Sequence, residues 1–304
     1  FFPKPKGITV IESYCNLADE VILLACKLGA QEVSVSLANT TSFQLEVRKQ
    51  RIDALTEAGS SGIHITLSRK QRRSTVSSND FRLETLEPLI SSTLEALPHM
   101  DEDPFYTLPD PKLQGRASGD LQFCDPEFEA YPSTEKVENL LKLEQETLAY
   151  DERLHTEEAY YSDSISHLVH ADSNGFLEGC TKTLYSRGIS MFAEDLKPLN
   201  GKKSESINTS RKQTDGWYTN ARYLRNLAPR SKLSEEAGQR TLRKLGAVKP
   251  KSCEVPVIFC TEMAQSFLGS LASAMMGENV FRKHSFLRDQ LGQRIANSNL
   301  RLSD

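Results

Sequence analysis

A change in the period of the hydrophobic pattern constrains the fold of this chain more than any other feature. Four aliphatic residues recur at helical spacing within residues 16–28, and Gly29 follows as a helix C-cap. Apolar and polar residues then alternate in residues 33–37, 43–47 and 63–67. A period of two places alternate side chains on opposite faces, so these segments predict half-buried strands of an antiparallel meander.

Turn and cap residues divide this first region further. Residues 39–42 and 57–61 have the chemistry of turns between strands, and the basic residues 69–73 predict a solvated hairpin tip. Residues 77–80 offer N-caps for a second helix, and Pro88 is expected in or near its first turn. The apolar stripe of that helix consists of Leu86, Leu89, Ile90, Leu94 and Leu97.

The middle of the chain predicts a linker and a second helix-and-strand unit. Residues 98–132 contain six prolines and many acids, which favours an extended path over the surface. Ser133 or Thr134 caps a helix, and strands follow over residues 159–193 with a turn at Asn174-Gly175.

The remainder of the chain predicts a mobile loop and the start of a third unit. Residues 197–214 are basic and lack periodicity, residues 217–224 resume a strand, and Ser234 caps a helix. A strand over residues 255–259 and a helix over residues 262–276, capped by Thr261, begin the third unit.

The predicted fold class is therefore α+β, with antiparallel β-meanders and flanking helices. We expect two α+β units and the start of a third. The expected domains are residues 10–97, a Pro-rich acidic linker over 98–132, a central domain over 133–248, and an incomplete C-terminal domain over 249–304.

Charge and cysteine content exclude several functional classes. Lys and Arg number 37 against 41 Asp and Glu, a net charge of −4, which argues against a nucleic-acid partner. The six cysteines form no CxxC pair, and no apolar run is long enough to span a bilayer. We therefore expect a cytoplasmic protein without a membrane partner.

The residues alone show no catalytic constellation. His167 and His170 form the one close histidine pair, and on a strand their rings would point to opposite faces. The chain has no HExxH, G-x-S-x-G, P-loop or G-x-G-x-x-G motif. The carboxylates of residues 101–103 lie in the linker and are expected to be solvated.

Several segments together resemble the TldD/PmbA family, and specifically its PmbA (TldE) branch. The order and spacing of these segments carry the resemblance over most of the chain. They are residues 32–36, 59–63, 74–80, 103–111, 172–176, 193–195, 240–247, 255–259 and 280–287. The resemblance implies a cytoplasmic metallopeptidase family, also described as modulators of DNA gyrase, in which TldD-type and PmbA-type chains form a heterodimer that cleaves unfolded or small peptides.

In this family the TldD-type subunit carries a helical HExxxH zinc motif, and the PmbA-type subunit does not. By alignment, the motif positions fall on Gly269, Ser270 and Ala274. None of these side chains can serve as a zinc ligand or carboxylate base in the usual way. The resemblance thus implies no catalytic or metal residue and no cofactor in this chain, with zinc in the TldD-type partner.

The chain also departs from the family pattern. A glycine common near Lys49-Gln50 is missing, and residues 197–214 look like an insertion. The family's C-terminal domain extends beyond Asp304, so the resemblance implies C-terminal truncation. The preferred function is a non-catalytic subunit, which pairs as a heterodimer or as a homodimer in isolation. The alternatives are a regulatory or binding protein, such as a gyrase-linked modulator, and an independent hydrolase.

Overall fold

The computed structural model describes residues 9–115, 119–195, 211–248 and 250–302. The chain divides into two compact units, Phe1–Ala247 and Val248–Asp304. We describe each unit by itself. No helix within the described ranges is both long enough and apolar enough to cross a bilayer.

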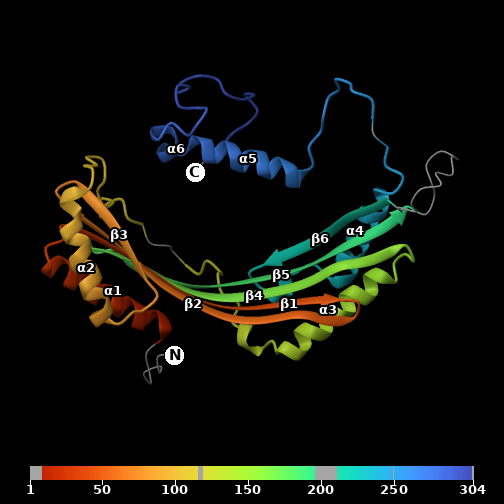
Figure 1. Ribbon diagram of the computed structural model, residues 1–304, viewed down its shortest axis with the longest axis horizontal. Coiled ribbons are helices and arrows are strands. Elements are labelled where there is room, and N and C mark those ends of the chain that lie inside the picture. Colours follow the sequence, from red (N-terminus) through yellow and green to blue (C-terminus); the bar gives the residue numbers. More distant parts are fainter. Residues whose placement is uncertain (1–8, 116–118, 196–210, 249, 303–304) are drawn as a thin grey trace. The chain divides into compact units, whose positions relative to one another are not determined.

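The first unit combines four α-helices with a six-stranded antiparallel sheet (Figure 1). The helices are α1 (Val10–Lys27), α2 (Leu83–Ala96), α3 (Ser133–Leu148) and α4 (Arg230–Arg243), and short 3-10 helices lie at Leu97–His99, Phe128–Ala130 and Leu224–Asn226. The strands are β1 (Glu32–Arg48), β2 (Arg51–Arg69), β3 (Arg72–Ser78), β4 (Leu154–Asp172), β5 (Leu177–Asp195) and β6 (Arg211–Ala221). Their order in the sheet is β3-β2-β1-β4-β5-β6, which confirms the α+β prediction.

One pairing joins the two predicted α+β units. β1 pairs with β4 in an antiparallel register that runs from Ser34↔Asp172 to Val47↔Ala159. The strands expected in the first unit and those expected in the second therefore belong to the same sheet, and the contact occurs across more than a hundred residues of intervening sequence.

Both hydrophobic cores lie on the same face of this sheet. Alternation along β1 buries Val33, Val35 and Leu37 near one end, and Phe43, Leu45 and Val47 near the other. The first group packs in a cluster with α1 and α2, and the second packs in a cluster with α3 and α4. Figure 1 shows α1 and α2 at one end of the long strands, and α3 and α4 at the other.

The predicted turns at residues 39–42 and 57–61 are wrong. Both segments lie inside long strands, and the β1–β2 ladder continues through Thr40↔Ser60. Hydroxyl-bearing and small residues suit turns, but the register fixed by the apolar residues on either side keeps this segment extended. The chain reverses instead at Lys49-Gln50, where both residues have positive φ (54° and 58°).

A buried carboxylate holds that reversal in place. Glu144 of α3 is fully buried and accepts the backbone N–H groups of Lys49 and Gln50 at 2.8 and 2.6 Å. The side-chain amide of Gln50 donates a third bond at 2.8 Å. Non-glycine residues pay a conformational cost at positive φ, and these charge-assisted bonds offset it. The hairpin thus forms without the glycine that the family pattern favours.

The basic hairpin tip is confirmed, but its charges and those of the linker are not simply solvated. Lys70 and Gln71 form the tip with positive φ (53° and 58°). Arg72 makes an ion pair with Glu102 at 2.8 Å, and Arg73 lies 3.5 Å from Asp103. The acidic linker segment therefore binds back onto the β2–β3 hairpin.

Several predicted helix starts also shift. α1 begins at Val10 with a capping box formed by Thr9, well before residue 16. Ser234, expected as a cap, lies inside α4. Pro88 lies near the start of α2 as predicted, at an exposed position in its second turn. The N-cap of α3 is Pro132, without a side-chain cap bond. Tertiary packing of the apolar stripe sets these boundaries more strongly than the cap residues do.

Other predictions for the first unit have mixed outcomes. The turn at Asn174-Gly175 is confirmed, with Gly175 at φ 96° between β4 and β5. The strand expected over residues 217–224 is β6, which begins at Arg211 and ends at Ala221. Residues 196–210, most of the predicted loop, lie outside the described residues.

The second unit contains α5 (Thr261–Met275) and α6 (Gly277–Phe281). The strand predicted over residues 255–259 is wrong, because this segment is irregular and its side chains are exposed. The N-cap of α5 is Cys260, one residue before the predicted cap. No residue of α5 is buried, so the unit has little core of its own.

We expect Glu144→Ala to destabilise the first unit by about 2 kcal/mol, because it removes the buried acceptor of the Lys49 and Gln50 backbone N–H groups, whose bonds are partly buried. Glu144→Gln keeps one acceptor oxygen and should cost less. Urea unfolding followed by circular dichroism measures both. Glu138→Ala, at an exposed ion pair on the same helix, is the control and should stay within about 0.5 kcal/mol of the unmodified chain. Equal effects of the Glu144 and Glu138 changes would contradict the role of Glu144.

Candidate functional site

The three positions aligned with the zinc motif lie on α5. Gly269 and Ser270 are exposed, and the Ser270 hydroxyl donates to the carbonyl of Ser266 at 3.0 Å. The carbonyl of Ala274 accepts a hydrogen bond from Ser285 at 2.6 Å. The three positions thus share one helix, but they contribute one hydroxyl and neither an imidazole nor a carboxylate.

Across the part of the chain that the structure describes, no three His, Cys, Asp or Glu side chains gather in a group that could hold a metal ion. His167 and His170 point to opposite faces of β4, as the strand spacing predicted. His167 bonds Thr181 at 3.0 Å, and His170 bonds Ser36 at 2.9 Å. The structure therefore does not bring this histidine pair together.

The second face of the sheet is the most distinctive surface of the first unit. Within the described residues of this unit, all four α-helices pack against the opposite face. The side chains on the helix-free face are mostly small and hydroxyl-bearing. On β1 they are Ser34, Ser36, Ala38, Thr40, Ser42 and Gln44, and on β4 they include Ser162, Ser164 and Ser166. Hydroxyls bond across the strands, as between Thr40 and Ser166 at 2.8 Å.

A row of titratable side chains crosses this face. Ser36 pairs with His64 on one side and with His170 on the other, and His170 pairs with Glu178 on β5. The Nδ1 atom of His64 bonds the Ser77 hydroxyl at 2.7 Å. Because Nδ1 of both imidazoles is engaged by a serine, their Nε2 atoms are the ones available for a ligand.

A groove of about 910 Å³ lies over part of this row. Its lining includes His64, His170 and Cys180 of the sheet, with Phe123 and Cys124 of the linker. It thus combines apolar walls with a few polar groups, as ligand-binding grooves do. Sequence reasoning missed this site, because the residues converge only through β1–β4 pairing and no local motif connects them.

Carboxylates gather near the other end of the same face. Glu158 lies in a hollow of about 310 Å³ beside Glu46 and Tyr160. Partial burial raises the pKa of Glu158, and the neighbouring charges of Glu46, Glu157 and Asp53 raise it further.

The outer edge of β2 is unpaired over much of its length. β3 pairs with β2 only from Ile63 to Arg69. Among the residues that the structure describes, the backbone of residues 51–62 therefore pairs with β1 alone. Residues 51–61 are exposed, and Ile52 and Leu55 are 49% and 48% exposed. Free backbone N–H and C=O groups along such an edge can pair with another extended chain.

Comparison with known proteins identifies the family. The model of the PmbA/TldA metallopeptidase central domain matches residues 126–245, and that of the C-terminal domain matches residues 252–304. The chain belongs to the PmbA/TldD family. The first of these matches covers α3, the second half of the sheet and α4, and the other covers α5 and α6.

Curated relatives of the PmbA type agree with this membership. The chain is 26% identical to metalloprotease PmbA of Escherichia coli O157:H7, over 95% of this chain and 62% of that relative. It is also 26% identical to a PmbA homolog of Buchnera aphidicola, over 92% of this chain and 59% of the homolog. The chain thus spans about three fifths of the length of these PmbA relatives.

Solved structures of PmbA/TldD-type proteins show the same fold. A protein of Bacteroides thetaiotaomicron described as a modulator of DNA gyrase matches with a TM-score of 0.82 at 23% identity, over 95% of this chain and 63% of that one. TldE of Thermococcus kodakarensis matches with a TM-score of 0.68 at 15% identity, over 90% and 58%.

We expect Glu158→Gln to raise the urea midpoint at neutral pH. A carboxyl whose pKa is raised on folding binds its proton more tightly in the folded state, so its contribution to stability falls as pH rises through the acid range. The gain should shrink when the measurement is repeated at a pH where Glu158 is protonated. Glu138→Gln, which removes a carboxylate paired with Lys142, is the control and should show no gain at neutral pH. A midpoint unchanged by Glu158→Gln would contradict the repulsion among these carboxylates.

Proposed function

We propose that this chain is the non-catalytic, PmbA/TldE-type subunit of a cytoplasmic zinc metallopeptidase complex that cleaves unfolded or small peptides. The observation that carries this proposal is the combination of family membership with Gly269, Ser270 and Ala274 at the zinc-motif positions. A zinc peptidase site needs imidazole or carboxylate ligands and a general base, and these three side chains supply neither. The zinc would then reside in a TldD-type partner.

The unpaired edge of β2 supports a role in holding peptide. An extended peptide that adds to residues 51–62 would bond through its main chain, which suits substrates of varied sequence. Exposed Ile52 and Leu55 offer apolar contact along this edge. In this proposal, the chain binds and aligns the peptide while the partner performs the hydrolysis.

Zinc content and activity test the subunit role. We expect the purified full chain to contain almost no zinc by elemental analysis and to leave an unfolded test peptide intact. Mixed with a TldD-type subunit, it should co-elute as a complex with one zinc site and cleave the peptide. Stoichiometric zinc and cleavage by the isolated chain would overturn the proposal. Failure to pair with any TldD-type subunit would favour a separate binding or regulatory role.

Adjacent proline substitutions test the β2 edge. Along an edge strand, successive backbone N–H groups point alternately toward the neighbouring strand and toward solvent. Of Thr56→Pro and Glu57→Pro, one therefore removes an N–H that faces β1, and the other removes an N–H that faces solvent. We expect the variant that removes the outward N–H to keep the melting temperature but to weaken peptide cleavage by the complex at least severalfold. Cleavage unchanged in a folded variant of this kind would place the peptide elsewhere.

A further inference from the structure

Arg187 is a buried cation without an anionic partner. It lies on β5, is 9% exposed, and forms no ion pair with any residue in the described ranges. Its Nη2 atom donates to the carbonyl of Ala228 at 2.8 Å, and its Nε atom has no hydrogen-bond partner among the residues that the structure describes. Buried polar atoms in native proteins nearly always have a partner, and an uncompensated buried charge is costly.

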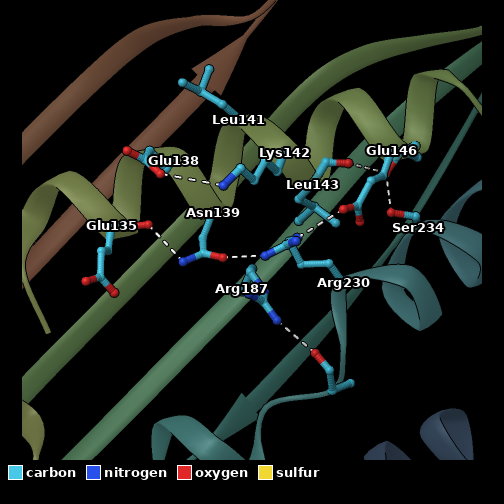
Figure 2. Close-up of polar contacts among 12 residues, drawn as sticks. Glu135, Glu138, Asn139, Leu141, Lys142, Leu143, Glu146, Arg187, Arg230 and Ser234 are labelled. Carbon is cyan, nitrogen blue, oxygen red and sulfur yellow. Dashed lines mark hydrogen bonds and ion pairs between the residues drawn. The ribbon is translucent and has the colours of Figure 1, made fainter.

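A second guanidinium lies next to it. Figure 2 shows Arg230 of α4 beside Arg187 beneath α3. Arg230 donates from Nε to Glu146 at 3.2 Å and from Nη1 to the amide oxygen of Asn139. Burial lowers the pKa of Arg187, and the charge of Arg230 acts in the same direction, yet a guanidinium stays protonated in proteins.

The start of α4 adds further positive potential. Its N-cap is Pro229, which offers no side-chain acceptor, and its first turn contains no acidic residue. The carbonyl that accepts from Arg187 belongs to Ala228, directly before this cap. A helix N-terminus carries about half a positive charge, so it favours an anion at this point.

The other charges nearby do not neutralise this cluster. Lys142 pairs with Glu138 on the exposed side of α3. Lys136 and Asp163 neutralise each other at 2.5 Å. Glu146 is therefore the one carboxylate in ion-pair contact with either guanidinium among the described residues.

We propose that Arg187, Arg230 and the N-terminus of α4 form a binding site for a small anion of the size of chloride. The Nε atom of Arg187 and the free amino group of Arg230 supply the donors. Because Arg187 is only 9% exposed, we expect this site to favour small anions over larger ones. The bound anion neutralises the buried guanidinium and ties β5 to both helices, independently of any role in peptide cleavage.

Thermal unfolding of the full chain tests the site. Sodium chloride replaces sodium gluconate at fixed ionic strength and neutral pH, and chloride is the probe. An anion that binds only the folded state should raise the melting temperature by about 3–6 °C when chloride is tenfold above its dissociation constant. The same titration should broaden the chloride NMR line, which reports binding directly.

Arg187→Met should abolish both responses. Arg240→Met is the control. Like Arg187, Arg240 has a buried Nε atom without a hydrogen-bond partner among the described residues, but its guanidinium is ion-paired with Asp215 at 3.6 Å and Glu236 at 3.8 Å. Its side chain is 29% exposed, close to the 31% of Arg230. This control should keep the full chloride response. If Arg187→Met does not fold, Arg230→Met serves instead, and it should shift the chloride midpoint about tenfold higher. The proposal would be overturned if chloride left the melting temperature of the unmodified chain unchanged. It would also be overturned if chloride raised the melting temperatures of the Arg187→Met and Arg240→Met variants equally.

Discussion

The antiparallel pairing of β1 with β4 is the constraint on which the rest of the first unit depends. Each strand is long, 17 residues for β1 and 19 for β4, and each passes over both helix pairs. Side chains alternate without interruption from Val33 to Val47 of β1 and from Ala159 to Ala171 of β4, since the bulge in β4 lies before this stretch, at Thr156/Glu158. Both hydrophobic clusters must therefore lie on the same face. The other face is thereby left without helices from this unit, and its small hydroxyl side chains suit that position.

The two clusters are stabilised in different ways. The cluster beneath α1 and α2 is almost wholly apolar. The cluster beneath α3 and α4 includes buried charges that each need a specific partner, namely Glu144, the Lys136–Asp163 pair and Arg187. The ammonium group of Lys136 also lies 4.5 Å from the centre of the Phe43 ring. A buried polar group that loses its partner is costly, so such groups tolerate few alternative packings.

The proposed peptide-binding role rests on features of the first unit, and the proposed lack of catalysis rests on α5. The helix-free face carries a groove and an imidazole row, and the β2 edge carries free backbone groups. The α5 positions carry no metal-binding side chain. Under the proposed function, peptide binding by this chain and hydrolysis by a TldD-type partner would be assigned to separate chains. The second unit also exposes apolar residues of α5, such as Phe267. Exposed apolar patches are typical of surfaces that contact other protein segments.

The sequence by itself determined the fold class, most element positions and the chemistry of residues 269, 270 and 274. Hydrophobic period is a local property, so α1, α2 and the strands around residues 33–37 and 63–67 could be predicted from it. The family resemblance rests on the order and spacing of short segments, so it could also be recognised from the sequence.

Only the tertiary structure decided which segments lie together. The turn-like residues 39–42 became the middle of a strand because β2 and β4 pair on both sides of them. Nothing in the sequence distinguishes Glu144 from other helical glutamates; the fold brings the Lys49-Gln50 reversal to it. Nor does the sequence distinguish Arg187 from other strand residues; the fold buries it beneath α3 and α4. The physical reason is the same in each case: long-range pairing fixes burial, and burial decides whether a polar side chain is solvated or needs a partner.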